Sequence, residues 1–266
     1  MDDIKEKIIE QSSGVLTEAY KDVISPSAKP VGTMLSYLPR TIRLGLSKWE
    51  KWIINGEESL RLTAEALKEK VDKIPEEKQC EPEPYVAVPA IQQIAYCYDS
   101  SELRDMYANL LAASMNTDKK WNVHPGFVDI IKQLTPDEAK LLKILPKNEQ
   151  AYTPLLDLQI KLGSKVTDGQ KTVFRNYTMY YDMNICEAPE NVGMYLENLS
   201  RLKLINILED VHLTDDNLYK VMENAPKLTD IKKRTKLKPG QSFTFKKKVF
   251  HLTAFGMAFI KCCIIE

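Results

Sequence analysis

The sequence of 266 residues contains few glycines and few histidines, and it lacks the common phosphate-binding motifs. Only 10 glycines are present, and neither G-x-G-x-x-G nor G-x-x-x-x-G-K-[ST] occurs. The 3 histidines show no two-histidine helix spacing, and no glycine-framed serine or cysteine–histidine motif appears. These absences argue against a nucleotide-driven enzyme, a hydrolase with a nucleophile–base pair and a zinc enzyme. No catalytic residue, metal ligand or cofactor is predicted.

Cysteines and long apolar runs are also scarce. The 5 cysteines are scattered without a C-x-x-C pair, which favours reduced intracellular thiols over a disulfide framework or a zinc site. The N-terminus opens with acids and has no apolar core typical of a secretory signal. No apolar run approaches the ~20 residues needed to cross a bilayer. The sequence therefore predicts a cytoplasmic protein, with peripheral contact at the inner membrane as an alternative.

The charges balance, because 37 basic and 37 acidic residues give a formal net charge of zero. Attraction to nucleic acid or to acidic lipid must then come from local patches. One patch is the basic segment 231–252, IKKRTKLKPGQSFTFKKKVFHL, which contains no acid. It is predicted to bind nucleic acid or another partner, and the alternative is a solvated strand edge protected by its lysines. The candidate binding residues are Lys232, Lys233, Arg234, Lys236, Lys246, Lys247 and Lys248.

Residues 34–54 form the second patch. Their apolar side chains recur at steps of three and four, which predicts an amphipathic helix similar to those lying at membrane surfaces. The alternative is internal packing, because residues 57–74 carry a matching apolar seam and Asn55 and Gly56 predict a tight turn between two helices. The candidate membrane-contact residues are Arg40, Arg43, Trp49 and Trp52.

The central stretch 102–134 contains His124, which is the natural candidate for a general acid or base. No partner for it is specified by a motif, and a structural role in the loop before Pro125 is favoured. Helical spacing places Met106 and Tyr107 in the core. Asp99 or Ser100 is predicted to cap the helix that follows.

Three parts are predicted along the chain. Residues 1–80 hold N-terminal amphipathic helices with a helical hairpin, and 81–146 form a central helical core. The proline- and acid-rich stretch 80–89 is expected to be an extended linker between them. In 147–266, a helix, two short strands and a closing helix capped by Thr253 indicate a winged-helix-like domain with a basic hairpin. The fold class is predominantly α (α+β).

Several segments together resemble the bacterial abortive-infection alpha family, Abi-alpha. The resemblance is most specific in 81–142, through the order of YANLLAASMN, VHPGFVDIIKQL and PDEAKLL, and LENLSRLKLI and HLTAFGMAFI extend it. Upstream, KDVISPSAKPVGTMLSYLPR is similar to the family's N-terminal portion. The resemblance implies a role in phage resistance, in which an infected cell stops growing or dies before phage progeny are released. It implies no catalytic residues.

The combined prediction is an antiviral defence protein that acts by binding a phage product, a host protein or nucleic acid through the basic hairpin. Three alternatives stay open. One is a membrane-acting effector that uses the amphipathic helix 34–54, and another is a winged-helix DNA-binding regulator. The third is an unrecognised nuclease or nucleotide hydrolase that uses His124.

Overall fold

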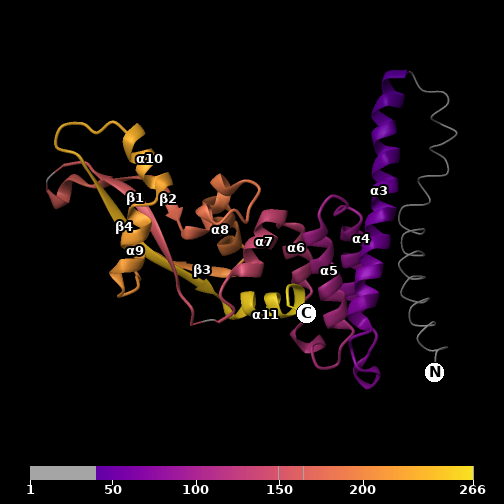
Figure 1. The fold of residues 1–266 in the computed structure, drawn as a ribbon. Coiled ribbons are helices and arrows are strands. Elements are labelled where there is room, and N and C mark those ends of the chain that lie inside the picture. Colours follow the sequence, from indigo (N-terminus) through magenta and orange to yellow (C-terminus); the bar gives the residue numbers. More distant parts are fainter. Residues whose placement is uncertain (1–39, 149, 164, 266) are drawn as a thin grey trace. The chain divides into compact units, whose positions relative to one another are not determined.

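The computed structural model describes residues 40–148, 150–163 and 165–265, with side chains from residue 55 onward except at Val166. These residues form two compact units, coloured along the chain in Figure 1. Unit 1 comprises the described residues of Met1–Pro136 and Lys261–Glu266, and unit 2 is Asp137–Ile260. The helix predicted upstream, as far as Val23, lies outside the described residues.

Unit 1 is a bundle of helices: α3 (Arg40–Val71), α4 (Pro84–Ile94), α5 (Ser101–Ser114) and α6 (Gly126–Lys132). Helix α5 lies at its centre, since every residue from Met106 to Ser114 is buried. The predicted core residues Met106 and Tyr107 are both completely buried. The Ser100 side chain caps α5 by accepting the Leu103 N–H at 3.2 Å, which confirms the predicted capping position.

The predicted helical hairpin at Asn55 and Gly56 is wrong, because α3 runs without interruption from Arg40 to Val71. Glycine in a helix interior costs only about 1 kcal/mol relative to alanine, and tertiary packing offsets that cost. Gly56 is buried against Ala95, and Ser59 donates to the Ile94 carbonyl oxygen at 2.5 Å. Close packing against the end of α4 therefore accounts for the glycine.

The predicted linker at 80–89 is extended only as far as Glu83, and helix α4 begins at Pro84. Proline suits a first helical turn because its missing N–H would have no partner there. Pro89 lies inside α4 and is tolerated in this short helix. Since α3, α4 and α5 pack against one another, the predicted boundary between 1–80 and 81–146 divides one bundle.

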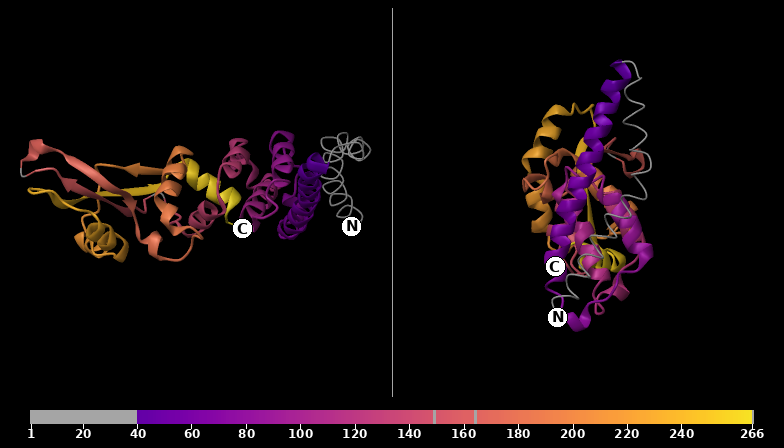
Figure 2. Two further views of the ribbon diagram at one scale, coloured as in Figure 1. Left: turned by 90° about the horizontal axis from the view of Figure 1, so that it is seen from above. Right: turned by 90° about the vertical axis from the view of Figure 1, so that its right-hand side faces the viewer.

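Unit 2 contains a four-stranded antiparallel sheet in the order β2-β1-β4-β3. The strands are β1 (Thr153–Lys161), β2 (Gln170–Tyr177), β3 (Ile205–Leu208) and β4 (Ser242–Leu252). The helices are α7 (Pro136–Ile144), α8 (Val192–Arg201), α9 (Asp216–Glu223), α10 (Pro226–Arg234) and α11 (Ala254–Cys263). Helices α9 and α10 lie together beside the sheet, as Figure 2 shows. The α+β class is confirmed, and the winged-helix arrangement stays a prediction.

Helix α11 belongs to both units, because residues up to Ile260 are part of unit 2 and those from Lys261 onward are part of unit 1. Thr253 caps its start by accepting the Gly256 N–H at 2.8 Å, as predicted. The boundary between the units lies at Pro136 and not at residue 146. The predicted parts 81–146 and 147–266 are therefore divided differently in the structure.

Candidate functional site

The three consecutive lysines of β4 lie on both faces of the sheet. Side chains alternate along a strand, so Lys247 projects from one face and Lys246 and Lys248 from the other. Lys247 forms an ion pair of 2.8 Å with Asp216 at the start of α9. Lys246 forms one of 2.8 Å with Glu209, which directly follows β3. Each lysine therefore has an acidic partner from a segment distant in sequence.

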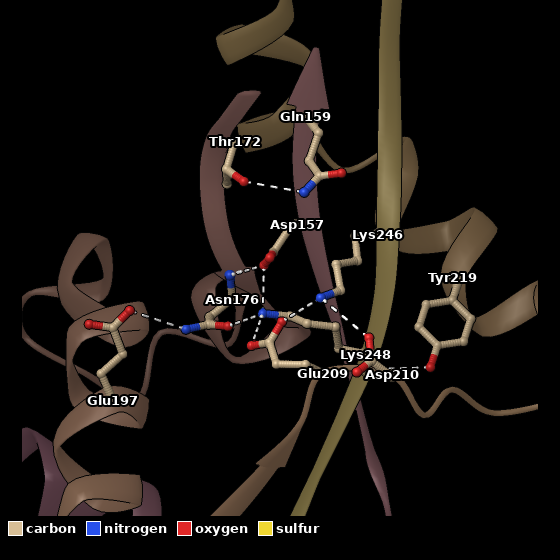
Figure 3. Close-up of polar contacts among 10 residues, drawn as sticks. All are labelled: Asp157, Gln159, Thr172, Asn176, Glu197, Glu209, Asp210, Tyr219, Lys246 and Lys248. Atoms are coloured by element: carbon tan, nitrogen blue, oxygen red, sulfur yellow. Dashed lines mark hydrogen bonds and ion pairs between the residues drawn. The ribbon is translucent and has the colours of Figure 1, made fainter. Parts of the chain in front are cut away.

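Lys248 is buried at the centre of a polar network, drawn in Figure 3. Its ammonium nitrogen lies 2.9 Å from Asp157 Oδ1, 3.1 Å from Glu209 Oε1 and 2.7 Å from Asn176 Oδ1. Asp157 stands opposite Lys246 in the β1–β4 register, so its side chain shares the sheet face of Lys246 and Lys248. The network satisfies all three donors of the buried ammonium group.

Asn176 reaches this network through an irregularity in β2. The β1–β2 register shifts between Leu156 and Leu158, so two residues of β2 stand opposite Asp157. Asn176 has a φ of 54°, in the left-handed region that asparagine tolerates better than most residues. Its backbone N–H donates to Asp157 Oδ1 at 2.8 Å. The bulge therefore turns Asn176 toward both Asp157 and Lys248.

The partner carboxylates of the outer lysines are held in their ionised form. Burial by itself raises the pKa of Glu209, but hydrogen bonds from Lys246 and Lys248 outweigh it and the net shift is downward. The hydrogen bond from Lys247 lowers the pKa of Asp216, and the same contact raises the pKa of Lys247. Both exposed pairs are consequently charged at neutral pH.

The binding candidates on α10 have mixed environments. The Lys232 ammonium group donates to the Glu223 carbonyl oxygen at 2.9 Å and lies 4.6 Å from the Phe245 ring centroid. Arg234 pairs with Asp230 at 2.9 Å on an exposed helix face. Lys233 and Lys236 are exposed and form no ion pair with a described residue. Only some of the predicted basic strip is thus available to a partner.

A cluster of free lysines lies where two loops meet at the end of the sheet. The β1–β2 hairpin and the loop before β4 converge there, because Lys161 pairs with both Gln170 and Ser242. The described part of the hairpin loop contains one acid, Asp168, whose carboxylate accepts the Lys165 backbone N–H at 2.8 Å. We name this cluster the basic tip; it comprises Lys161, Lys165, Lys171, Lys236 and Lys238, all exposed and without an ion pair to a described residue.

His124 is exposed and its ring supports the local backbone. Its Nδ1 accepts the Gly126 N–H at 3.0 Å, at the start of α6. The ring centroid lies 5.9 Å from that of Phe127, a completely buried residue of the same helix. These contacts fit the structural role that the sequence favours for His124.

The membrane-contact candidates lie in the first half of α3, where side chains are outside the described set. Arg40, Arg43, Trp49 and Trp52 thus keep their standing as predictions. Among the described residues, no helix combines the length and apolar character needed to cross a bilayer. Continuity of α3 removes the hairpin that was expected to cover residues 34–54 internally.

The acids that hold the three lysines could not be identified from local sequence. Asp157, Glu209 and Asp216 are 91, 37 and 31 positions from Lys248 (248 − 157), Lys246 (246 − 209) and Lys247 (247 − 216), respectively. The one available indication was Asp157 itself, an isolated acid in an otherwise apolar run, LLDLQI, that reads as a buried strand. A buried acid requires a partner, and β4 supplies it.

The described residues thus define a two-unit α+β protein with an internally neutralised strand, an exposed basic tip and no His, Cys, Asp or Glu cluster suited to a metal ion. A family model described as abortive infection alpha matches residues 55–263, and the chain belongs to this family.

Among solved structures, the chain is similar to an uncharacterized protein from the hydrocarbon-degrading marine bacterium Alcanivorax borkumensis SK2. The identity is 17%, the TM-score is 0.34, and the match covers 54% of this chain and 92% of that one. No curated protein matches the sequence.

Proposed function

We propose that this protein acts in abortive-infection defence against phage by binding an anionic partner, nucleic acid or an acidic phage product, at the basic tip. Membership of the abortive infection alpha family supports the defence role. The separation between neutralised and free lysines in unit 2 supports the binding surface.

The observation that carries the proposal is the contrast between β4 and the basic tip. On β4, Lys246 and Lys247 are paired within the unit, and Lys248 is buried. At the tip, five lysines are exposed and the described part of the adjoining hairpin loop offers one carboxylate, Asp168. Such a surface keeps a local positive potential although the whole chain is neutral.

Nucleic acid fits this surface because its phosphates repeat at short intervals along the backbone. Each lysine that neutralises a phosphate releases counterions, so binding falls steeply as salt rises, with a slope of about −0.7 to −0.9 per contacted phosphate. The tip predicts binding that depends on charge and not on base sequence.

The test uses a triple charge reversal, Lys171→Glu with Lys236→Glu and Lys238→Glu, in the full chain. Bacteria expressing this variant, the unchanged protein or an empty vector are infected at low and at high phage-to-cell ratio. The unchanged protein is expected to protect the culture at low ratio and to let it collapse at high ratio. The variant is expected to lose protection while its thermal unfolding stays the same.

A matched control is Lys132→Glu, an exposed lysine of α6 that lies outside the tip. This control should protect as well as the unchanged protein. Full protection by the triple variant would refute the tip as the binding surface. Loss of protection without any salt-dependent nucleic-acid binding would identify an acidic phage product as the partner.

A membrane-acting effector is the competing function, and the same infected cells test it. Fractionation at the time of culture collapse would find the protein with the inner membrane if residues 34–54 act there. A protein that stays in the soluble fraction, with membrane potential unchanged, favours the basic tip.

A further inference from the structure

Unit 1 contains a cavity of about 190 Å³ that the proposed function does not use. It is enclosed by the last turns of α3 and α5, the loop after α5 and the C-terminal end of α11, all of which belong to unit 1. Its polar lining consists of Lys70, Lys73, Asn109, Asn116, Lys119 and Lys261, together with the Cys262 residue. Four lysines and two amides line the cavity without a single acid among the lining residues.

The charge of this cavity suits an anion. Lys70 pairs with Asp105 at 2.9 Å, so that lysine is partly neutralised. Lys119 and Lys261 are exposed, and neither forms an ion pair with a described residue. Both lie close enough to Cys262 to favour its thiolate, although burial outweighs them and raises the pKa of that thiol to about 11. The thiol is therefore neutral, and the two ammonium groups keep their charge for another anion.

The ends of three helices also face this region, and their last carbonyl groups carry partial negative charge. Lysines near helix C-termini offset that charge, and this accounts for part of the basic lining. The helix ends carry about half an elementary charge each. Four lysines with one acidic partner exceed that requirement, which leaves room for a ligand with one or two negative charges.

An exposed aromatic ring lies in the loop that borders the cavity. Trp121 is 83% exposed, which is unusual for the largest apolar side chain. It follows Lys119, a lining residue, by two positions, and the next residue, Asn122, accepts the Cys262 thiol at 3.5 Å. The Lys120 ammonium nitrogen lies 4.8 Å from the ring centroid of Trp121. The loop thus places a planar ring beside a lysine-lined cavity.

We propose that unit 1 binds a nucleotide, with its phosphates among Lys119, Lys261 and the neighbouring amides and its base stacked on Trp121. The cavity is smaller than the roughly 300–1,000 Å³ of pockets that enclose a whole drug-sized ligand. A ligand whose charged end enters while its planar end stays outside fits this size. Side-chain charge here replaces the glycine-rich loop that the sequence lacks.

The test is calorimetric titration of the full chain with four nucleoside triphosphates (ATP, GTP, CTP and UTP), with inorganic tripolyphosphate and with the unphosphorylated nucleosides. At least one triphosphate is expected to bind more tightly than both tripolyphosphate and its own nucleoside. Trp121→Ala is expected to weaken that triphosphate about tenfold, as loss of one stacked base does, and to leave tripolyphosphate binding unchanged. Lys119→Ala with Lys261→Ala is expected to weaken both ligands.

Lys132→Ala is the matched control, since Lys132 is an exposed lysine of unit 1 outside the cavity. All variants change exposed side chains, and unchanged thermal unfolding verifies their folding. Absence of saturable binding by any triphosphate overturns the inference. Equal affinity for triphosphate and tripolyphosphate, or binding that Trp121→Ala and the double lysine variant do not alter, also overturns it. None of these outcomes depends on the basic tip of unit 2.

Discussion

The ammonium nitrogen of Lys248 lies 2.9 Å from a carboxylate oxygen of Asp157, and the two side chains are 1% and 3% exposed. A buried charge is stable only with a close opposite charge and further hydrogen bonds, which Asn176 and Glu209 supply here. The pair joins the two central strands of the sheet. Its loss is therefore expected to affect the whole of unit 2.

Removing one member of this pair should be far more harmful than removing both. Asp157→Ala leaves the Lys248 ammonium group partly uncompensated and is expected to cost about 3–5 kcal/mol of unfolding free energy. The double variant Asp157→Leu with Lys248→Met replaces the charges by apolar groups and should be closer to the unchanged protein. Urea unfolding of both variants measures the difference. A double variant as unstable as Asp157→Ala would contradict the argument.

Reversing the charge of all three β4 lysines should damage folding. Lys248→Glu places a third carboxylate beside Asp157 and Glu209 in a buried site, where like charges cannot all ionise. The variant Lys246→Glu, Lys247→Glu, Lys248→Glu is expected to give little soluble folded protein. The triple reversal at the basic tip should fold normally, and circular dichroism of the two proteins provides the comparison. A well-folded β4 variant would show that the network is dispensable.

Two glycines should respond oppositely to alanine. At Gly56 a new Cβ would meet Ala95 at 3.5 Å, an ordinary contact, and the helix is continuous there. Gly56→Ala should therefore stabilise the protein by about 0.4–1 kcal/mol. At Gly256 a new Cβ would lie 1.9 Å from the Leu204 carbonyl oxygen, so Gly256→Ala should destabilise it by roughly 1–3 kcal/mol or more. Thermal unfolding distinguishes them, and destabilisation by Gly56→Ala would indicate a turn at that position.

Asp137 should make unit 2 sensitive to acid. Burial by itself raises the pKa of Asp137, but N–H groups of Ala188 and Glu187 and the Tyr195 hydroxyl donate to it, and the net shift is below the ordinary 3.8. A lowered folded-state pKa gives stability that is present above the unfolded pKa and lost as pH falls through the folded pKa.

The measurement for Asp137 is the unfolding midpoint between neutral pH and about pH 2, compared with Asp137→Asn. The unchanged protein should be the more stable at neutral pH and should lose stability more steeply below about pH 4. Parallel curves for the two proteins would show that Asp137 contributes no such dependence.

Periodicity and capping patterns predict the local structure of this chain well. Met106 and Tyr107 are buried as their helical spacing predicts, and Ser100 and Thr253 cap the helices they precede. These features depend on neighbours within a few positions. Local sequence is sufficient for them because the partner groups lie in the same turn of the helix.

The errors arise where packing between distant segments decides. Gly56 reads as a helix stop, but contact with Ala95 and the Ser59 bond to Ile94 keep α3 continuous. Lysines 246–248 read as a free basic edge, because their acidic partners stand at least 31 positions away. The basic tip was only partly predicted, since Lys161, Lys165 and Lys171 join it through the register of β1 and β2. Tertiary neighbours of this kind leave no mark in local sequence.

The sharing of α11 between the units bears on the order in which the chain is completed during translation. Asn109, at the centre of unit 1, donates to the carbonyl oxygen of Cys263 at 3.1 Å, and the 124 residues of Asp137–Ile260 separate unit 1's two segments. A ribosome adding about 5–20 residues per second needs roughly 6–25 s to make that intervening stretch. Unit 1 therefore waits for the last residues of α11, and a premature stop anywhere in unit 2 leaves both units incomplete.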